Sequence, residues 1–211
     1  AKGAISAFAL TEPGGGSDAR AIRTTARLDG DEWVIDGSKA FITNSGTPLT
    51  SVILVAARDE DADDGDVSTI VVPVGTQGLS VGPSYRKMGW RASDTHEVSF
   101  DGCRVPADHL LGERGRGYAQ FLETLADGRV AIAALSVGLA RGCLEESLRY
   151  ASEREAFGRP IGAFEALQFK MADMQVGVET ARLAYQRAAW LRDHGRPFAT
   201  EASIAKLYAS E

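Results

Sequence analysis

Cysteine and histidine are scarce in this sequence, which limits the chemistry that the chain can carry. Its 211 residues include two cysteines and three histidines. Cys103 and Cys143 lie in unlike sequence contexts, so the sequence argues against a disulfide scaffold and favours a cytoplasmic protein. His96, His109 and His194 are far apart, and none has a partner at the i, i+4 spacing of a metal site. We therefore expect no bound metal.

Long apolar runs and an excess of positive charge are also missing. No stretch approaches the ~18 consecutive apolar residues of a membrane span, and the N-terminus lacks the basic and then apolar layout of a signal peptide. The formal net charge is −6, whereas nucleic acids select basic surfaces. We therefore expect neither a membrane nor a nucleic acid as a partner. The densest acidic cluster, residues 59–66, is predicted to form a solvated loop.

Residues 1 to about 110 consist of short apolar or alternating runs separated by turn residues. This pattern is typical of an antiparallel β-barrel or β-sandwich, and it includes strands predicted at residues 51–56 and 67–73. Asp-Gly accepts the positive φ angles of a tight turn. Three such dipeptides are therefore predicted to form hairpin turns, namely Asp29-Gly30, Asp36-Gly37 and Asp101-Gly102.

The composition changes after Pro106. From Tyr118 onward, long stretches rich in Ala, Leu, Glu and Arg predict helices. Their expected positions are about residues 117–153, about residues 164–193 and from about residue 200.

Together the two halves predict an α+β chain. We expect a β domain at residues 1–112 that binds the ligands, and a truncated antiparallel helical bundle at residues 113–211. The chain has no initial Met and stops within a helical pattern, so we expect it to be an excerpt from a longer polypeptide.

A glycine-rich stretch follows the first predicted strand, residues 4–10. Pro13 ends the strand, and the three glycines after it lack the Cβ atoms that would keep a ligand away from backbone N–H groups. Ser17 and Asp18 add a hydroxyl and a carboxylate. Taken alone, three glycines fit a surface turn equally well. A phosphate-binding P-loop is excluded, because no Gly-Lys-Ser/Thr follows and the next segment alternates like a strand.

The sequence also contains several longer motifs whose order and spacing along the chain are informative. The glycine-rich stretch reads Thr11-Glu12-Pro13-Gly14-Gly15-Gly16-Ser17-Asp18 and is followed by Ala21. A second run reads Lys39-Ala40-Phe41-Ile42-Thr43-Asn44. Further runs are Lys87-Met88-Gly89-Trp90-Arg91, Phe100-Asp101-Gly102-Cys103-Arg104-Val105-Pro106, Gly128-Arg129 and Arg154-Glu155-Ala156-Phe157-Gly158. In their order and spacing, and over nearly the whole chain, these runs resemble the acyl-CoA dehydrogenase family of flavoproteins.

The resemblance implies an FAD cofactor. Leu10 and Thr11 would hydrogen-bond the pyrimidine edge of the flavin, and Phe41 and Thr43 would lie against its ring, with the Thr43 hydroxyl near N5. Judged alone, Phe41 is more typical of core packing, and only the Ile-Thr-Asn context favours contact with the flavin. The cofactor-binding residues that the resemblance implies are Phe8, Leu10, Thr11, Gly16, Ser17, Phe41, Ile42, Thr43, Arg154 and Phe157.

The resemblance also implies a second subunit and a substrate. Arg154 and Phe157 match residues that in relatives reach the FAD of a neighbouring subunit, so we expect a homo-oligomer, either a tetramer or a dimer. Judged alone, Arg129 fits a side chain that snorkels at a domain edge. The residues implied to contact the acyl-CoA are Ser17, Asp127, Gly128 and Arg129.

Some positions depart from the family pattern. Ala126 stands where relatives often have Asp, and Glu165 stands where they commonly have Gln. No catalytic residue is predicted in this chain. Some relatives carry their catalytic Glu where this chain has Gly128, and most others carry it at a position beyond Glu211.

The activity that the resemblance implies belongs to the complete protein. It would oxidise an acyl-CoA thioester to trans-2-enoyl-CoA in fatty acid β-oxidation and pass the electrons to an electron-transferring flavoprotein. We expect the 211 residues alone to be inactive. Two alternatives stay open: a flavin-dependent monooxygenase or acyl-CoA oxidase on the same scaffold, and a non-enzymatic binding module.

Overall fold

The computed structural model describes residues 4–19, 21–62 and 66–211. It divides into two compact units, of which one ends at Phe121 and the other runs from Leu122 to Glu211.

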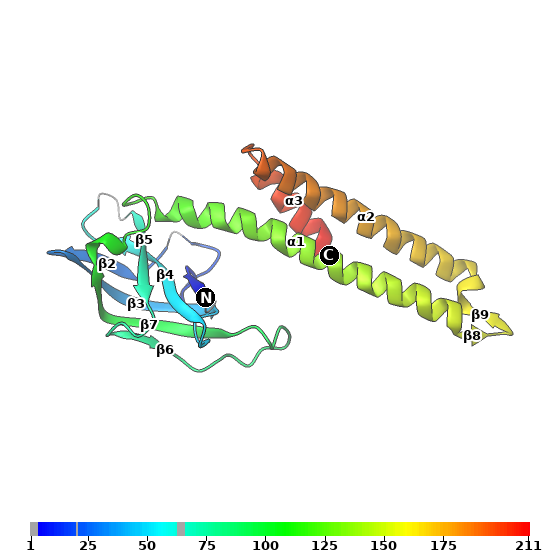
Figure 1. The fold of residues 1–211 in the computed structure, drawn as a ribbon, viewed down its shortest axis with the longest axis horizontal. Helices are drawn as coiled ribbons and strands as arrows, with labels where there is room; N and C mark the ends of the chain where they lie inside the picture. Colours follow the sequence, from blue (N-terminus) through cyan, green and yellow to red (C-terminus); the bar gives the residue numbers. More distant parts are fainter. Residues whose placement is uncertain (1–3, 20, 63–65) are drawn as a thin grey trace. The chain divides into compact units, whose positions relative to one another are not determined.

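The first unit is built from one large sheet, shown on the left of Figure 1. Short strand-forming runs rich in Val, Ile and Thr alternate with turns, as the sequence predicted. The strands are β1 (Ile5–Ala9), β2 (Thr25–Asp29), β3 (Glu32–Thr43), β4 (Thr50–Asp59), β5 (Val67–Pro73), β6 (Leu79–Val81) and β7 (Thr95–Pro106).

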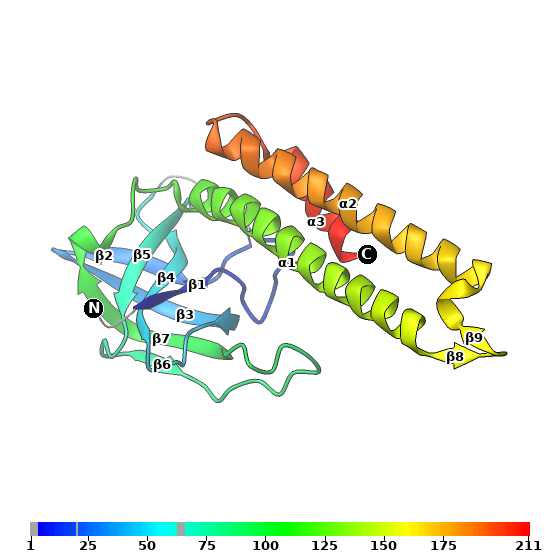
Figure 2. The ribbon, with the colours of Figure 1, turned by 45° about the vertical axis from the view of Figure 1, so that its right-hand side comes forward.

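The order across this sheet is β1-β4-β2-β3-β7-β6, and β5 pairs with the other side of β4. Figure 2 shows the strands curling around a common interior. The predicted α+β class is confirmed, but the sheet is mixed rather than antiparallel throughout. Both β1 and β2 run parallel to β4, whereas the other pairs are antiparallel. The interior is apolar, and its largest fully buried members include Trp33, Ile35, Ile53, Ile70 and Val98.

One of the three Asp-Gly predictions is confirmed. Asp29-Gly30 connects β2 and β3 as a hairpin, and Gly30 has a φ of 67°. The other two predictions are wrong, because β3 and β7 continue through them. Asp36-Gly37 and Asp101-Gly102 instead face each other at a bulge, where the Gly102 N–H donates to Asp36 Oδ1 at 2.7 Å. A bulge can require the same positive φ angles as a tight turn, so an Asp-Gly dipeptide is suited to either structure.

The prediction that residues 59–66 form a solvated loop is wrong for the first of these residues, Asp59. Asp59 ends β4 and has 0% of its surface exposed. Its carboxylate accepts hydrogen bonds from Arg114 Nε at 2.5 Å and Arg114 Nη2 at 2.7 Å, and a further one from the Ser68 hydroxyl at 3.3 Å. A carboxylate without water needs such partners. Asp61 is exposed, as expected, and residues 63–65 of the cluster lie outside the described part of the chain.

Helices dominate the rest of the chain, close to the predicted ranges. They are α1 (Gly117–Glu153), α2 (Glu165–Asp193) and α3 (Ala199–Ser210). Between α1 and α2 lie a short hairpin, β8 (Glu155–Ala156) with β9 (Arg159–Pro160), and the 3₁₀ turn η3 (Ile161–Ala163); another 3₁₀ turn, η2 (Ala107–His109), follows β7. None of the helices in the described ranges has the length and apolarity that a membrane span requires.

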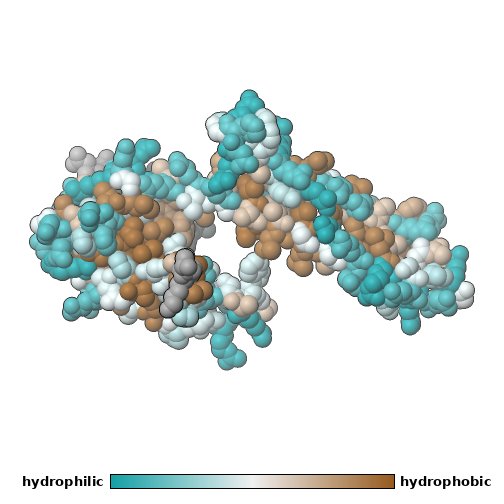
Figure 3. Space-filling model, in the orientation of Figure 1, coloured by the Kyte–Doolittle hydropathy of each residue, from teal (hydrophilic) through white to brown (hydrophobic). Residues whose placement is uncertain are grey.

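In the second unit, α2 runs back alongside α1, and α3 packs against α2 (Figure 1). Val137 and Leu144 of α1 are buried against Val178 and Ala181 of α2. Part of the exposed surface of these helices is apolar, and it appears as brown patches among teal in Figure 3. On α2 this exposed stripe repeats every seven residues, at Phe169, Val176, Leu183 and Trp190.

Candidate functional site

The glycine-rich stretch folds into a narrow turn directly after β1. Glu12 and Gly15 exchange two backbone hydrogen bonds of 3.1 Å, with Pro13 and Gly14 at the tip. The chain then passes back beside its own start. A Cβ atom on Gly16 would lie 3.4 Å from Thr11 Cγ2, so the absence of a side chain at Gly16 allows this close approach.

The second motif lies on β3, at a bulge between Lys39 and Ile42. Phe41 has a φ of 60° and 67% of its surface exposed, whereas Ile42 is 1% exposed and belongs to the core. Core packing is therefore excluded for Phe41. A bulky residue with positive φ carries backbone strain, and such strain concentrates at functional sites. Thr43 is exposed like Phe41, two residues along the strand.

The two motifs are hydrogen-bonded to each other. The Ala40 N–H donates to the Thr11 carbonyl oxygen at 2.9 Å, which brings Thr11 next to the exposed Phe41. Within the described residues, neither the Thr11 N–H nor its hydroxyl has a hydrogen-bond partner, and the same holds for the Thr43 hydroxyl. The Phe41 ring lies 5.1 Å from the ring of Tyr85 but stays largely exposed. Such a ring beside several unused donors is suited to a planar, polar-edged ligand.

A buried ion pair lies behind this surface, and the sequence reasoning missed it. The Lys39 ammonium has 0% of its surface exposed and lies 2.8 Å from Glu12 Oε1, and Glu12 is 8% exposed. Lys39 also donates to the Leu10 carbonyl oxygen at 3.2 Å. The Glu12 carboxylate accepts further bonds from the backbone N–H groups of Arg23 (2.8 Å) and Thr24 (2.9 Å). The sequence offered one signal for this ion pair, because each of the two motifs contains an ionisable residue and the two residues carry opposite charges.

Burial and hydrogen bonding act on this pair in opposite directions. Burial would raise the pKa of Glu12, but hydrogen bonds from Lys39 and from the backbone of Thr24 and Arg23 outweigh it, so the pKa is lowered. Burial lowers the pKa of Lys39, and the adjacent carboxylate opposes this change.

A second polar cluster holds the end of β3. The ring of His96, which pairs with Ile42 across the sheet, lies with Nδ1 2.6 Å from the Gly82 carbonyl oxygen and Nε2 2.5 Å from Asp94 Oδ1. The other oxygen of Asp94 accepts the Gly46 N–H at 2.8 Å. Both ring nitrogens therefore face acceptors, which suits the doubly protonated ring. Burial opposes this charge, but the hydrogen bonds to Asp94 and Gly82 raise the pKa of His96.

Other predicted residues of the first unit lie close by with different surroundings. Phe8 packs its ring 4.3 Å from that of Phe121, and Leu10 belongs to the same cluster. Leu10 and Ile42 are buried, so their backbone groups rather than their side chains can face a ligand at this site, whereas Phe8 is half-buried. Ser17 is exposed, and its hydroxyl has no partner among the described residues.

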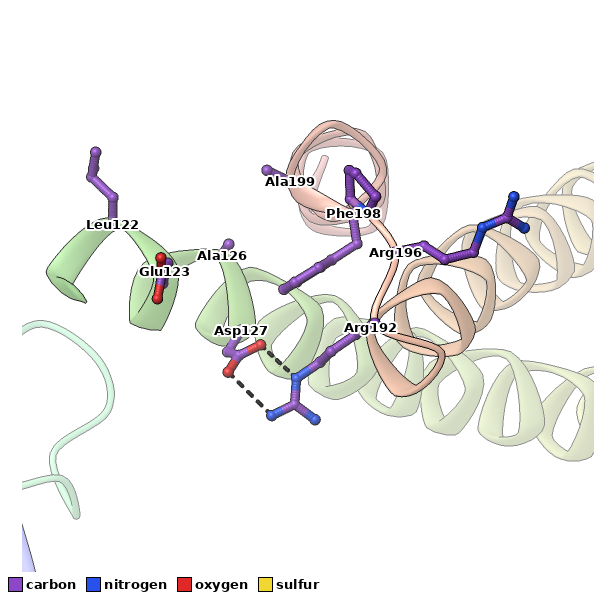
Figure 4. Close-up of a pocket in the computed structure, with 10 residues that line it drawn as sticks. Leu122, Glu123, Ala126, Asp127, Arg192, Arg196, Phe198 and Ala199 are labelled. Carbon is purple, nitrogen blue, oxygen red and sulfur yellow. Dashed lines mark hydrogen bonds and ion pairs between the residues drawn. The ribbon is translucent and has the colours of Figure 1, made fainter. Parts of the chain in front are cut away.

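Three of the four residues predicted to contact the substrate, namely Asp127, Gly128 and Arg129, lie on α1 in the second unit, whereas Ser17 belongs to the first unit. Figure 4 shows that Asp127 forms an ion pair with Arg192 of α2, with Nε–Oδ1 at 2.5 Å and Nη2–Oδ2 at 3.1 Å. The pair borders a pocket of about 630 Å³ whose walls include Leu122, Phe198 and Ala199. The next residue, Gly128, is exposed. Arg129 is half-buried and forms no ion pair within the described structure.

The last two predicted residues lie at the far end of α1. Arg154 is exposed, and its side chain has no partner among the described residues. Phe157, in the tip of the β8–β9 hairpin, has a φ of 53° and is 96% exposed. Asp127 and Glu153 are separated by 26 helical residues, which corresponds to about 40 Å. The two groups of residues on α1 therefore cannot contact one small ligand within a single chain.

The described residues contain no group of three or more His, Cys, Asp or Glu side chains able to hold a metal ion. The two cysteines are free, and burial raises the pKa of the Cys103 thiol to about 11. The site accordingly offers hydrogen-bond donors and an aromatic face rather than a nucleophile.

Comparisons with known proteins agree along the whole chain. Residues 7–103 match the middle domain of acyl-CoA dehydrogenase, and residues 115–211 match its C-terminal domain. The mitochondrial short-chain specific acyl-CoA dehydrogenase of Bos taurus is 46% identical, over 98% of this chain and 50% of its own length. The chain thus spans about half the length of such curated relatives.

Solved structures show the same fold. Butyryl-CoA dehydrogenase of Megasphaera elsdenii is 36% identical with a TM-score of 0.92, over 98% of this chain and 54% of its own. The prolyl acyl carrier protein oxidase AnaB is 33% identical with a TM-score of 0.92, over the same 98% and 54%. With both halves matched in order, the chain belongs to the acyl-CoA dehydrogenase family.

Proposed function

We propose that this chain supplies the β domain and the first helices of the C-terminal domain of an FAD-dependent acyl-CoA dehydrogenase. The complete protein would convert a saturated acyl-CoA into trans-2-enoyl-CoA. The observation that carries the proposal is the pairing of the two motifs: Thr11, with two unused donors, is bonded at 2.9 Å to Ala40, beside the outward-facing Phe41.

These residues fit the ring of FAD. The Thr11 N–H and hydroxyl would donate to the pyrimidine edge, and Phe41 would cover one part of the ring face. The Thr43 hydroxyl would lie near N5, and the bare backbone at Gly16, with the Ser17 hydroxyl, would contact the cofactor and the acyl-CoA. When bound, FAD supplies the acceptor for the hydride that leaves the acyl β carbon. The chain's own part is to bind and orient both molecules.

Ser17 would contact the acyl-CoA, and the family resemblance assigns further substrate contacts to Asp127, Gly128 and Arg129 on α1. Arg129 would provide a cation for an anionic or carbonyl group of the substrate. The Asp127–Arg192 ion pair would fix the pocket wall to which both of its members belong. A short acyl chain is proposed because the relatives named above include a short-chain specific enzyme.

Arg154 and Phe157 would serve the cofactor of a second subunit. Their distance of about 40 Å along α1 from the substrate residues supports this division, as do the exposed ring of Phe157 and the unpaired side chain of Arg154. The enzyme would then be a homo-oligomer, a dimer or a tetramer, whose active site includes residues of two chains.

We further propose that residues 1–112 and 113–211 act as the ligand-binding β domain and the helical domain. An electron-transferring flavoprotein would accept the electrons, and the enzyme would act in fatty acid β-oxidation in the cytoplasm. The two free cysteines support a reducing compartment.

The test uses the complete protein, purified without added cofactor. We expect it to be yellow, and its visible flavin absorption should bleach when a short-chain saturated acyl-CoA is added without oxygen. A colourless protein would favour the non-enzymatic binding module. A yellow protein that no acyl-CoA bleaches would contradict the proposed substrate class.

An acyl thioester oxidase is the second candidate, because a structure named as an oxidase shares the fold at 33% identity. The two functions differ in whether the reduced protein reacts with oxygen. Mixing protein, acyl-CoA and air without another electron acceptor separates them. Rapid formation of peroxide would identify an oxidase, and its absence together with turnover by an added acceptor would identify a dehydrogenase.

A further inference from the structure

The buried Glu12–Lys39 ion pair connects three segments of the first unit. Glu12 belongs to the glycine-rich turn, Lys39 to β3, and the carboxylate also accepts the backbone N–H groups of Arg23 and Thr24 at the entry to β2. With Lys39 fully buried, this arrangement excludes water from both charges. Removing either partner alone would leave an uncompensated charge in the interior.

The pair also determines the orientation of one peptide group. Lys39 Nζ donates to the Leu10 carbonyl oxygen at 3.2 Å. In a planar trans peptide, the carbonyl of one residue and the N–H of the next point in opposite directions. The Leu10 carbonyl points toward the buried ammonium, so the Thr11 N–H points away from it. That N–H is the donor without a protein acceptor in the described part of the chain.

A second bond fixes the next peptide in the same way. The Thr11 carbonyl accepts the Ala40 N–H at 2.9 Å, and the Glu12 N–H on the other side of that peptide donates to Gly15 at 3.1 Å. Both peptide groups around Thr11 are thus held from β3. A simple surface turn would need no charge pair in the interior, since a buried pair adds little or nothing to stability over an apolar replacement.

We propose that Glu12 and Lys39 are positioning residues: their ion pair holds the Leu10–Thr11 peptide in the orientation in which Thr11 binds the edge of the flavin. The inference rests on the proposed function, because it assigns the reason for the buried pair to the cofactor. It adds two residues that do not themselves touch the cofactor.

The test compares the complete protein with the double variant Glu12→Gln/Lys39→Met, which removes both charges at nearly unchanged volume. We expect the folded double variant to bind FAD about tenfold more weakly, which corresponds to about 1.4 kcal/mol. The reduction potential of its bound flavin should fall, because a displaced donor no longer stabilises the charge gained on reduction. Hydrogen exchange of the Ala40 N–H in the cofactor-free protein should accelerate.

A matched control is available in the same unit. Asp59 and Arg114 form another ion pair with a fully buried carboxylate, but none of its hydrogen bonds reaches the Leu10–Glu12 segment. Asp59→Asn/Arg114→Met should change thermal stability while leaving the FAD dissociation constant and the flavin potential as in the wild type. Should the first double variant prove insoluble, Glu12→Asp keeps both charges and withdraws the carboxylate by one methylene, with the same direction of effect expected.

Two results would overturn the inference in different ways. If Thr11→Val weakens FAD binding but the variants of Glu12 and Lys39 leave both the dissociation constant and the potential unchanged, the ion pair has no positioning role and the flavin site stands. If Thr11→Val also has no effect on FAD binding, the proposed flavin site itself is wrong, and the positioning role is wrong with it.

Discussion

In the first unit, polar groups without a protein partner among the described residues lie close to a residue of unusual backbone geometry, Phe41. Thr43 is exposed at the end of β3, and its hydroxyl has no partner among the described residues. Thr25 of β2 offers the same side chain on the same sheet, paired with Asp36 rather than with the end of β3 that carries Thr43. These two threonines allow the role of one hydroxyl to be isolated.

Thr43→Val should slow flavin reduction by acyl-CoA about tenfold, which is the value of one hydrogen bond made in the transition state. The FAD dissociation constant should change much less, because ring stacking and the Thr11 donors remain. Stopped-flow absorbance and a FAD titration measure the two quantities. Thr25→Val should change neither, and equal losses in rate and affinity for Thr43→Val would contradict a role near N5.

His96 gives the first unit a pH dependence whose sign follows from its geometry. Hydrogen bonds to Asp94 and Gly82 raise its pKa in the folded state. Its stabilising effect is therefore complete below the unfolded value of about 6.5 and is lost as the pH rises through the higher folded value.

The melting temperature of the wild type should exceed that of His96→Gln most clearly below about pH 6.5. The difference should shrink as the pH rises above the folded pKa, because the neutral ring can no longer donate to both acceptors. Scanning calorimetry across this range measures it. A difference independent of pH would show that the pKa of His96 is the same in the folded and the unfolded protein.

At the scale of whole elements, β3 shows how far the sequence alone leads. Its strand character and the contact of the second motif with FAD were both expected, the latter from the family resemblance. Strict alternation from Ile35 would have buried Phe41 and Thr43. The bulge between Lys39 and Ile42 reverses the alternation, so Phe41 and Thr43 are exposed and Ile42 is buried.

Such bulges escape prediction because their causes lie on other strands. The positive φ angles at Gly37 and Gly102 could equally serve hairpins, and only the pairing of β3 with β7 decides between the two. The same holds for the Glu12–Lys39 ion pair, since neither charge reveals its burial until β1 and β3 lie together. The helices were easier to predict, because the periodicity that indicates a helix lies within one segment of the sequence.

The glycines of α1 provide a test of local propensity against packing. A Cβ atom on Gly138 would meet nothing within 4 Å, whereas one on Gly117 would lie 2.7 Å from the Ser68 backbone. Gly138→Ala should therefore stabilise the protein by about 1 kcal/mol. Gly117→Ala should destabilise it by about 1–3 kcal/mol, because β5 cannot yield at its backbone. Urea unfolding of both variants measures the two effects, and stabilisation by both would contradict the close packing of β5 on α1.

At the scale of the whole molecule, the proposed cofactor site requires residues from more than one chain. Arg154 and Phe157 lie about 40 Å along α1 from Asp127, and apolar side chains repeat every seven residues on the exposed face of α2. Both features are consistent with an oligomer in which one subunit completes the cofactor site of another.

Arg154→Ala should lower the FAD content and shift the protein to smaller assemblies, because the Arg154 side chain would contact both the cofactor and the neighbouring subunit. Analytical ultracentrifugation with the flavin-to-protein absorbance ratio reads both quantities. Arg149 is the matched control, since its guanidinium is engaged by Glu146 at 2.7 Å and Glu153 at 2.9 Å within the same helix. Unchanged cofactor content in Arg154→Ala would exclude the cross-subunit contact.

The central claim is that the flavin ring lies against the surface formed by Thr11, Phe41 and Thr43. A crystal structure of the complete protein purified with FAD tests it most directly. The account predicts the pyrimidine edge within about 3.2 Å of the Thr11 nitrogen, with the Phe41 ring against the flavin face and the Thr43 hydroxyl beside N5. A flavin bound elsewhere, in contact with none of these three residues, would contradict it.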